Sequence, residues 1–220
     1  ARHPERLGAG LIRMLEQAKA HGLYLMTIYT DAHPSQLARM RPYLDRFLGC
    51  NVGEVFTFRL NETDDPELAP ARKATNDLRQ LADNFLHSVK SCVKRRREDG
   101  WTRLMVTGGI ATLDYEILGG IDIPVVEDFA VPHINLASAI SRGLYRQFGL
   151  PLWGTDLAHE HYSFLPYSSP HKMPMLTASL YLKYMAGCKL MLVESGNWWQ
   201  QSDHVEDTPM HRVPKLDLGS

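Results

Sequence analysis

The sequence has little of what marks the specialised protein classes. It contains only three cysteines in 220 residues, so neither a disulfide framework nor a cysteine-based metal site is expected. No apolar run approaches the roughly 18–20 residues that a membrane-spanning helix needs. The 24 basic residues are balanced by 25 acidic ones, which argues against the basic surface that binds nucleic acid. We therefore expect an ordinary globular chain with no nucleic-acid partner and no membrane partner.

The three cysteines are widely spaced, and we expect them to be small buried apolar side chains. They are Cys50, Cys92 and Cys188. The chain begins Ala1-Arg2-His3-Pro4 without an initiator methionine, which fits a mature secreted protein, a processed product or a renumbered segment alike. Among the possible compartments, a secreted or periplasmic one is slightly favoured.

Several motifs of common enzyme classes are also missing. The sequence has no GxGxxG and no GxxxxGK[ST], the glycine-rich turns that hold phosphates in open nucleotide-binding sheets. It has no Gly-x-Ser-x-Gly elbow either, so a serine hydrolase of the α/β-hydrolase type is not supported.

Helical and strand-like patterns alternate along the chain. Apolar residues at helical spacing predict helices, and short β-rich apolar runs predict strands. The expected helices are 4–21, 34–46, 66–99, a short one after Gly108-Gly109, one from a cap at Asn135 to Phe148, and 173–187; the expected strands are 23–29, 47–54, 103–107, 121–127, 150–158 and 189–194. Six strand-helix units favour an α/β fold with a parallel sheet, either open or closed as a (β/α)8 TIM-type barrel.

The barrel is favoured because acidic residues follow nearly every predicted strand, where the active site of such a barrel lies. A full barrel typically takes about 250 residues and eight strands, whereas six units are visible here. We therefore expect residues 1–220 to form a single α/β barrel domain or the larger part of one, within a longer protein.

Two glutamates stand out among the acids at the strand ends. Glu127 follows Val-Val, and Glu194 follows Leu-Val, so each side chain should start in an apolar barrel mouth where desolvation and neighbouring acids raise a carboxyl pKa. Glycoside cleavage requires such a pair, because one carboxyl group protonates the leaving oxygen and the other acts as nucleophile or base. We predict Glu127 and Glu194 as the catalytic pair, with Glu54 and Asp156 beside them.

Aromatic and polar residues near the same strand ends suit a carbohydrate substrate. Flat rings stack on the C–H faces of sugars, and polar side chains bind the hydroxyl groups. The candidates for this role are Trp153, His159, Tyr162, Asn197 and Trp198.

Two segments resemble bacterial (β/α)8 glycoside hydrolase-like proteins. The run 142–156, RGLYRQFGLPLWGTD, is similar to their helix followed by a G-x-P-x-W-G strand, and the run 179–194, SLYLKYMAGCKLMLVE, is similar to their helix, turn and strand ending in Glu. The resemblance covers roughly residues 100–200. It implies the barrel fold and hydrolysis of a glycosidic bond in an oligo- or polysaccharide, with no cofactor and no metal. It also implies Glu127 and Glu194 as the acid/nucleophile pair.

The segments depart from the commonest retaining arrangement, in which an Asn-Glu pair is followed by a Glu three strands later. Here Val126 precedes Glu127, and Glu194 comes two predicted strands later. The stereochemical outcome, retaining or inverting, therefore stays open.

Two other functions remain as alternatives. His159 and His161 form a His-x-His pair that could present two imidazoles to one metal ion, as in a metal-dependent hydrolase. The chain could also be a carbohydrate-binding barrel whose acids are not in reactive geometry. The sequence does not indicate an oligomeric state.

Overall fold

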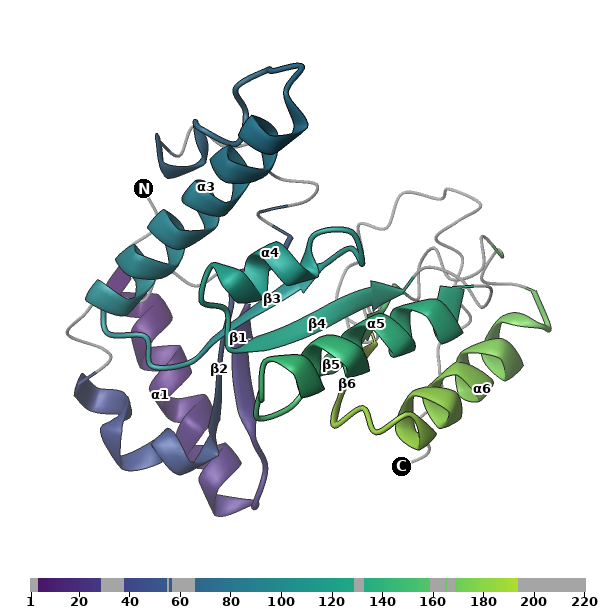
Figure 1. Ribbon diagram of the computed structural model, residues 1–220. Coiled ribbons are helices and arrows are strands. Elements are labelled where there is room, and N and C mark those ends of the chain that lie inside the picture. Colours follow the sequence, from purple (N-terminus) through teal and green to yellow (C-terminus); the bar gives the residue numbers. More distant parts are fainter. Residues whose placement is uncertain are drawn as a thin grey trace. The chain divides into compact units, whose positions relative to one another are not determined.

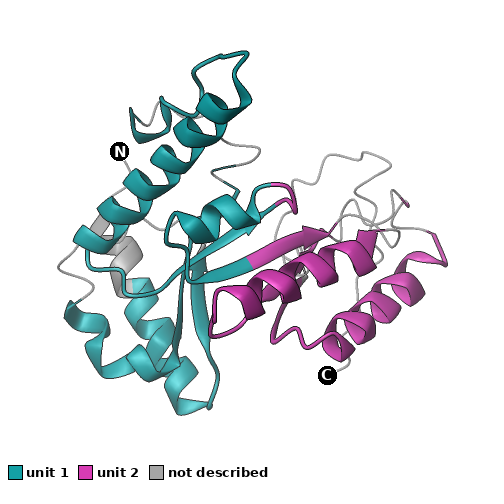
Figure 2. Cartoon of the chain, in the orientation of Figure 1, with its two compact units in different colours: residues 1–108, 112–124 teal, residues 109–111, 125–220 magenta. Residues whose placement is uncertain are grey.

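The computed structural model describes residues 4–28, 38–54, 56, 66–128, 133–158, 165 and 169–193. The contacts of the chain divide it into two compact units (Figure 2). Unit 1 comprises residues 1–108 and 112–124, and unit 2 comprises residues 109–111 and 125–220.

Strands and helices alternate along the chain (Figure 1). The strands are β1 (Leu25–Ile28), β2 (Phe47–Asn51), β3 (Leu104–Gly108), β4 (Ile123–Asp128), β5 (Gly154–Leu157) and β6 (Leu190–Val193). The helices are α1 (Pro4–Ala20), α3 (Leu78–Glu98), α4 (Leu113–Leu118), α5 (Ile134–Gln147) and α6 (Lys172–Met185), with the 3-10 helices η1 (Arg41–Arg46) and η2 (Pro66–Leu68).

The strands follow one another in the sheet in chain order, from β1 to β6. Pairing is parallel between β1 and β2, β2 and β3, β4 and β5, and β5 and β6. The predicted α/β class with parallel strands is therefore confirmed. Closure of this sheet into a (β/α)8 barrel stays a prediction.

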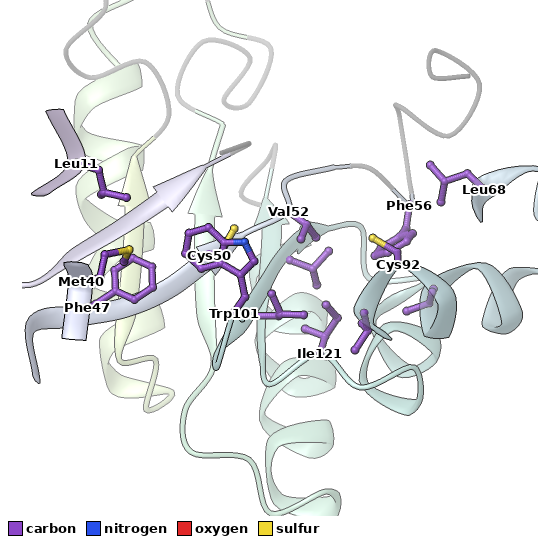
Figure 3. Close-up of a cluster of buried hydrophobic side chains, with 14 of the residues drawn as sticks. Leu11, Met40, Phe47, Cys50, Val52, Phe56, Leu68, Cys92, Trp101 and Ile121 are labelled. Atoms are coloured by element: carbon purple, nitrogen blue, oxygen red, sulfur yellow. The ribbon is translucent and has the colours of Figure 1, made fainter. Parts of the chain in front are cut away.

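In unit 1, one face of the sheet packs against helices. Cys50 of β2 and Leu104 of β3 are register partners, and both belong to the hydrophobic core that includes residues of α1 and α3 (Figure 3). Because alternate residues of a strand point to opposite faces, Asn51, Met105 and Thr107 point to the other face. The core consists of Leu11, Ile12, Leu15, Met40, Phe47, Cys50, Val52, Phe56, Leu68, Val89, Cys92, Val93, Trp101, Leu104, Val106 and Ile121.

The long helix of unit 1 begins later than its sequence pattern predicts. We expected it to start at Pro66, but only residues 66–68 form a 3-10 turn, and α3 starts at Leu78. The carboxylate of Asp77 accepts hydrogen bonds from the backbone N–H groups of Arg79 and Gln80, which is the geometry of an N-cap. The cap fixes the start of the helix well after the expected point.

The start of α5 differs from its expected position by a smaller amount. We expected Asn135 to cap this helix, but α5 begins at Ile134 and His133 occupies the cap position without a side-chain hydrogen bond. Asn135 is therefore the second residue of the helix. The helix ends before Gly149, whose φ of 61° lies in the left-handed region that favours glycine.

In unit 2, contacts with α6 show to which face of the sheet the side chains of β4 and β5 point. Leu157 of β5 packs against Leu176 of α6, and Asp128, the register partner of Leu157, forms an ion pair with Lys183 of the same helix at 3.1 Å. These residues therefore point to the face that carries α6. The alternate positions, Glu127 and Asp156, point to the opposite face.

The expectation for the cysteines is confirmed, since all three are buried and keep their thiols out of disulfides. Among the residues that the structure describes, no helix combines the length and the apolar character that a membrane crossing requires.

Candidate functional site

Two of the predicted site residues, Glu127 and Asp156, lie side by side in unit 2. They are register partners on the parallel strands β4 and β5, and neighbouring strands are about 4.8 Å apart. Both side chains point to the face of the sheet opposite α6. Both positions are also near the carboxyl ends of their strands, which is where α/β folds with parallel strands place their active sites.

The backbone around this carboxylate pair is well fixed. Val125 and Val126, which precede Glu127 in β4, are fully buried. The Thr155 hydroxyl donates a hydrogen bond to the Val126 carbonyl at 3.2 Å, and the Ala158 N–H donates to the Asp128 carbonyl at 3.1 Å. The two strands are thus joined by a side-chain hydrogen bond before the pair and by a backbone bond after it.

The two carboxyl groups differ in their exposure to solvent. Glu127 is 8% exposed, whereas Asp156 is half-buried. Burial disfavours the ionised form of a carboxyl group. A pair of this kind can therefore combine a carboxylic acid that donates a proton with a carboxylate that accepts one or stabilises positive charge.

Glu54 belongs to unit 1, where it is half-buried and follows Gly53 in the turn after β2. Next to it, the Asn51 side chain donates a hydrogen bond to the Thr107 hydroxyl at 2.8 Å and accepts one from the Gly53 N–H, also at 2.8 Å. This network joins the carboxyl ends of β2 and β3. We had not predicted Asn51 and Thr107 as site residues, although each comes at the end of an apolar run and the pattern could have identified them.

A second group in unit 1 that we had not predicted is the carboxyl group of Glu116. Its side chain is fully buried and lies against Gly108, the last residue of β3, where an added Cβ would come within 3.0 Å of both carboxyl oxygens. The Thr112 hydroxyl donates to Oε1 at 3.2 Å, and Oε2 has no hydrogen-bond partner among the described residues. Burial raises the pKa of Glu116 to about 8, so this group carries its proton at neutral pH.

Trp153 does not lie where a sugar-binding ring is needed. It is 1% exposed and precedes β5, so it is at the amino end of that strand. Its carbonyl accepts a hydrogen bond from the Lys189 N–H at 3.2 Å. The ring is part of the interior and offers no face to a sugar, and we therefore remove Trp153 from the candidate site.

The remaining predicted site residues lie outside the described part of the chain. They are Glu194, the catalytic partner predicted for Glu127, and His159, Tyr162, Asn197 and Trp198. His161, which forms the possible metal-binding pair with His159, also lies outside it. Among the described residues, no group of three or more His, Cys, Asp and Glu side chains is arranged to hold a metal ion.

Comparison with known proteins matches the chain to no family model and to no curated protein. The resemblance to glycoside hydrolase-like barrels therefore rests on the two segments at 142–156 and 179–194. The functional argument depends on the residues themselves, above all on the carboxylate pair of β4 and β5.

Proposed function

We propose that the chain is a glycoside hydrolase-like (β/α)8-barrel protein, or the larger part of one, that cleaves a glycosidic bond in an oligo- or polysaccharide. The observation that carries this proposal is the register pairing of Glu127 with Asp156 on the face opposite α6. This pairing places Glu127, one of the two acids that such a reaction needs, near the carboxyl end of its strand and beside a second carboxyl group.

In this reaction Glu127 is the general acid. It is the more buried member of the pair, and burial favours the protonated form. Its proton goes to the glycosidic oxygen as the bond to the anomeric carbon breaks, so the leaving sugar departs as an alcohol.

Glu194 is the nucleophile or the general base in the same proposal. It directly follows Val193, the last residue of β6. As a nucleophile it would form a glycosyl ester that water later hydrolyses, and as a base it would take a proton from the attacking water. Asp156 is the neighbouring carboxylate that sets the charge around Glu127.

The test compares three conservative variants with the wild type on a panel of oligosaccharides, with release of reducing ends as the readout. Glu127→Gln and Glu194→Gln should each reduce turnover by several orders of magnitude, because each removes a group that transfers a proton or forms a bond. Asp156→Asn should reduce turnover by a smaller factor and change its pH profile. All three should melt within a few degrees of the wild type.

Glu98→Gln is the matched control, because Glu98 is an exposed carboxylate on α3 and its loss should leave turnover unchanged. Wild-type turnover in Glu127→Gln would overturn the assignment of the acid. A wild-type protein that binds the saccharides without cleaving any of them would instead show a carbohydrate-binding barrel. Activity that is lost on chelation and restored by zinc would favour the metal-dependent alternative with His159 and His161.

A further inference from the structure

The helix α6 buries its charged side chains and exposes its apolar ones. Its only two charged residues, Lys172 and Lys183, are buried, at 1% and 0% exposure. Its large exposed side chains are apolar or aromatic, and they include Tyr181 at 65% and Met185 at 71%. A surface helix normally shows the opposite arrangement, and an exposed apolar patch of this kind marks an interaction surface.

Six exposed residues of α6 form one continuous stripe, which we call the α6 stripe. They are Pro174, Thr177, Ala178, Tyr181, Leu182 and Met185. Their spacing of i, i+3, i+4, i+7, i+8 and i+11 places them on one side of the helix. None of them is charged.

We propose that the α6 stripe is an interface with a second copy of this chain, in which two α6 helices pair antiparallel about a two-fold axis. This inference rests on the order of small and large side chains along the stripe. Its first half is small or compact, with Pro174, Thr177 and Ala178, and its second half is large. A two-fold axis between residues 179 and 180 therefore sets each large side chain of one copy opposite a small one of the other.

The three pairings of this arrangement are Tyr181 with Ala178, Leu182 with Thr177, and Met185 with Pro174, each across the axis. In a two-fold interface, a contact of residue i with residue j is repeated as j with i, so each pairing occurs twice. Large side chains set against small ones allow the close interdigitation that helix pairs require.

Charge favours a second copy as well. Two identical surfaces repel each other when they carry net charge, but the α6 stripe carries none and the whole chain has a formal charge of −1. The stripe has six residues over about three helical turns, whereas a standard interface takes roughly 20–30 residues a side. We therefore expect a reversible dimer rather than an obligate one.

The test is sedimentation velocity of the purified chain across a concentration series that reaches about 100 µM. The wild type should shift from monomer to dimer as concentration rises. Tyr181→Glu should raise the dissociation constant at least tenfold, because it buries a charge opposite Ala178 of the second copy. Leu136→Glu is the matched control: Leu136 is a large apolar residue of the same unit, 51% exposed, and it lies on α5 instead of α6.

A second experiment tests the register of the pairing. Ala178→Lys alone should weaken the dimer, whereas mixing that variant with Tyr181→Glu should restore association, because the introduced lysine of one chain then faces the introduced glutamate of the other. A wild type that stays monomeric at about 100 µM would overturn the proposal. Equal effects of Tyr181→Glu and Leu136→Glu, or no recovery in the mixture, would overturn the α6 stripe as the interface.

Discussion

The two units bury charged groups in their interiors in different ways. In unit 1, Glu116 is fully buried with one carboxyl oxygen bonded to Thr112, and burial raises its pKa to about 8. In unit 2, Asp128 and Lys183 are both fully buried and form an ion pair at 3.1 Å. The first group is neutral because it keeps its proton, whereas the second site sets a carboxyl group and an ammonium group against each other at ion-pair distance.

Because of this difference, the stability of the two units should respond to different changes. A neutral buried acid is stable only while it keeps its proton, so the stability of unit 1 should depend on pH. A buried ion pair depends on the presence of both partners, because either charge alone is strongly disfavoured in a low-dielectric interior. Unit 2 should therefore be sensitive to substitution of Lys183 or Asp128.

The largest expected effect is that of Lys183→Met, which removes the ammonium group that lies 3.1 Å from the buried Asp128 carboxylate. Removal of one partner of a buried pair typically costs about 3–5 kcal/mol. The free energy of unfolding, measured in urea, should fall by about this amount. The double variant Lys183→Met/Asp128→Asn should lose less than Lys183→Met, because asparagine carries no charge that must be buried without Lys183.

The three buried cysteines report which unit opens. Cys188 is in unit 2, and Cys50 and Cys92 are in unit 1. Burial raises the pKa of the Cys188 thiol to about 11, so in the native protein it should resist alkylation by iodoacetamide. In Lys183→Met, its alkylation should speed up by about 100-fold or more, since roughly 1.4 kcal/mol corresponds to a factor of ten. Equal acceleration at all three cysteines would contradict the local effect.

The next effect is the pH dependence that Glu116 gives to unit 1. The folded pKa is about 8 and the ordinary value is 4.5, so the folded state binds more protons than the unfolded state in this window. The contribution of Glu116 to stability is fully present below about pH 4.5, decreases as the pH rises, and is lost above about pH 8. The expected slope inside the window is at most about 1.4 kcal/mol per pH unit, the limit for a single titrating group.

Glu116→Gln isolates this slope, because glutamine is neutral at every pH and can still accept the Thr112 hydrogen bond. The difference in unfolding free energy between Glu116→Gln and the wild type should change in favour of the variant as the pH rises from about 5.5 to 7.5. Asp114→Asn is the control, since Asp114 is an exposed acid on the same helix and its removal should leave most of the slope in place. A difference that is independent of pH would show that Glu116 is ionised in the folded protein.

The alternation of helices and strands could be predicted from the sequence because apolar periodicity directly reflects burial. Strands such as 104–108 and helices such as 172–185 lie within one or two residues of their expected positions. The start of α3 was misplaced because a continuous apolar pattern does not show where a cap interrupts it. Only the hydrogen bonds of Asp77 to Arg79 and Gln80 fix that start.

The site could be predicted only where a residue's place along a strand was enough. Glu127 was selected because it follows an apolar run, and Asp156 because it lies near the end of the next predicted strand. Their pairing depends on the register between β4 and β5. Trp153 was misjudged because its ring type suggested sugar binding, while its position before β5 makes it part of the interior. Glu116 had no signal in the sequence, since its burial beside Gly108 depends on how α4 packs.

The smallest expected effect is that of Gly108→Ala on the free energy of unfolding. In Gly108→Ala the new methyl group would lie 3.0 Å from both carboxyl oxygens of Glu116, so the side chain must shift by a few tenths of an ångström. We expect a loss of about 1 kcal/mol in unfolding free energy, at the low end of overpacking costs, because a glutamate side chain can partly adjust. In the background of Glu116→Ala the same glycine substitution should be nearly neutral, since the neighbouring carboxyl group is gone. A loss of equal size in both backgrounds would mean that the backbone at residue 108, and not the carboxyl group of Glu116, is what requires glycine.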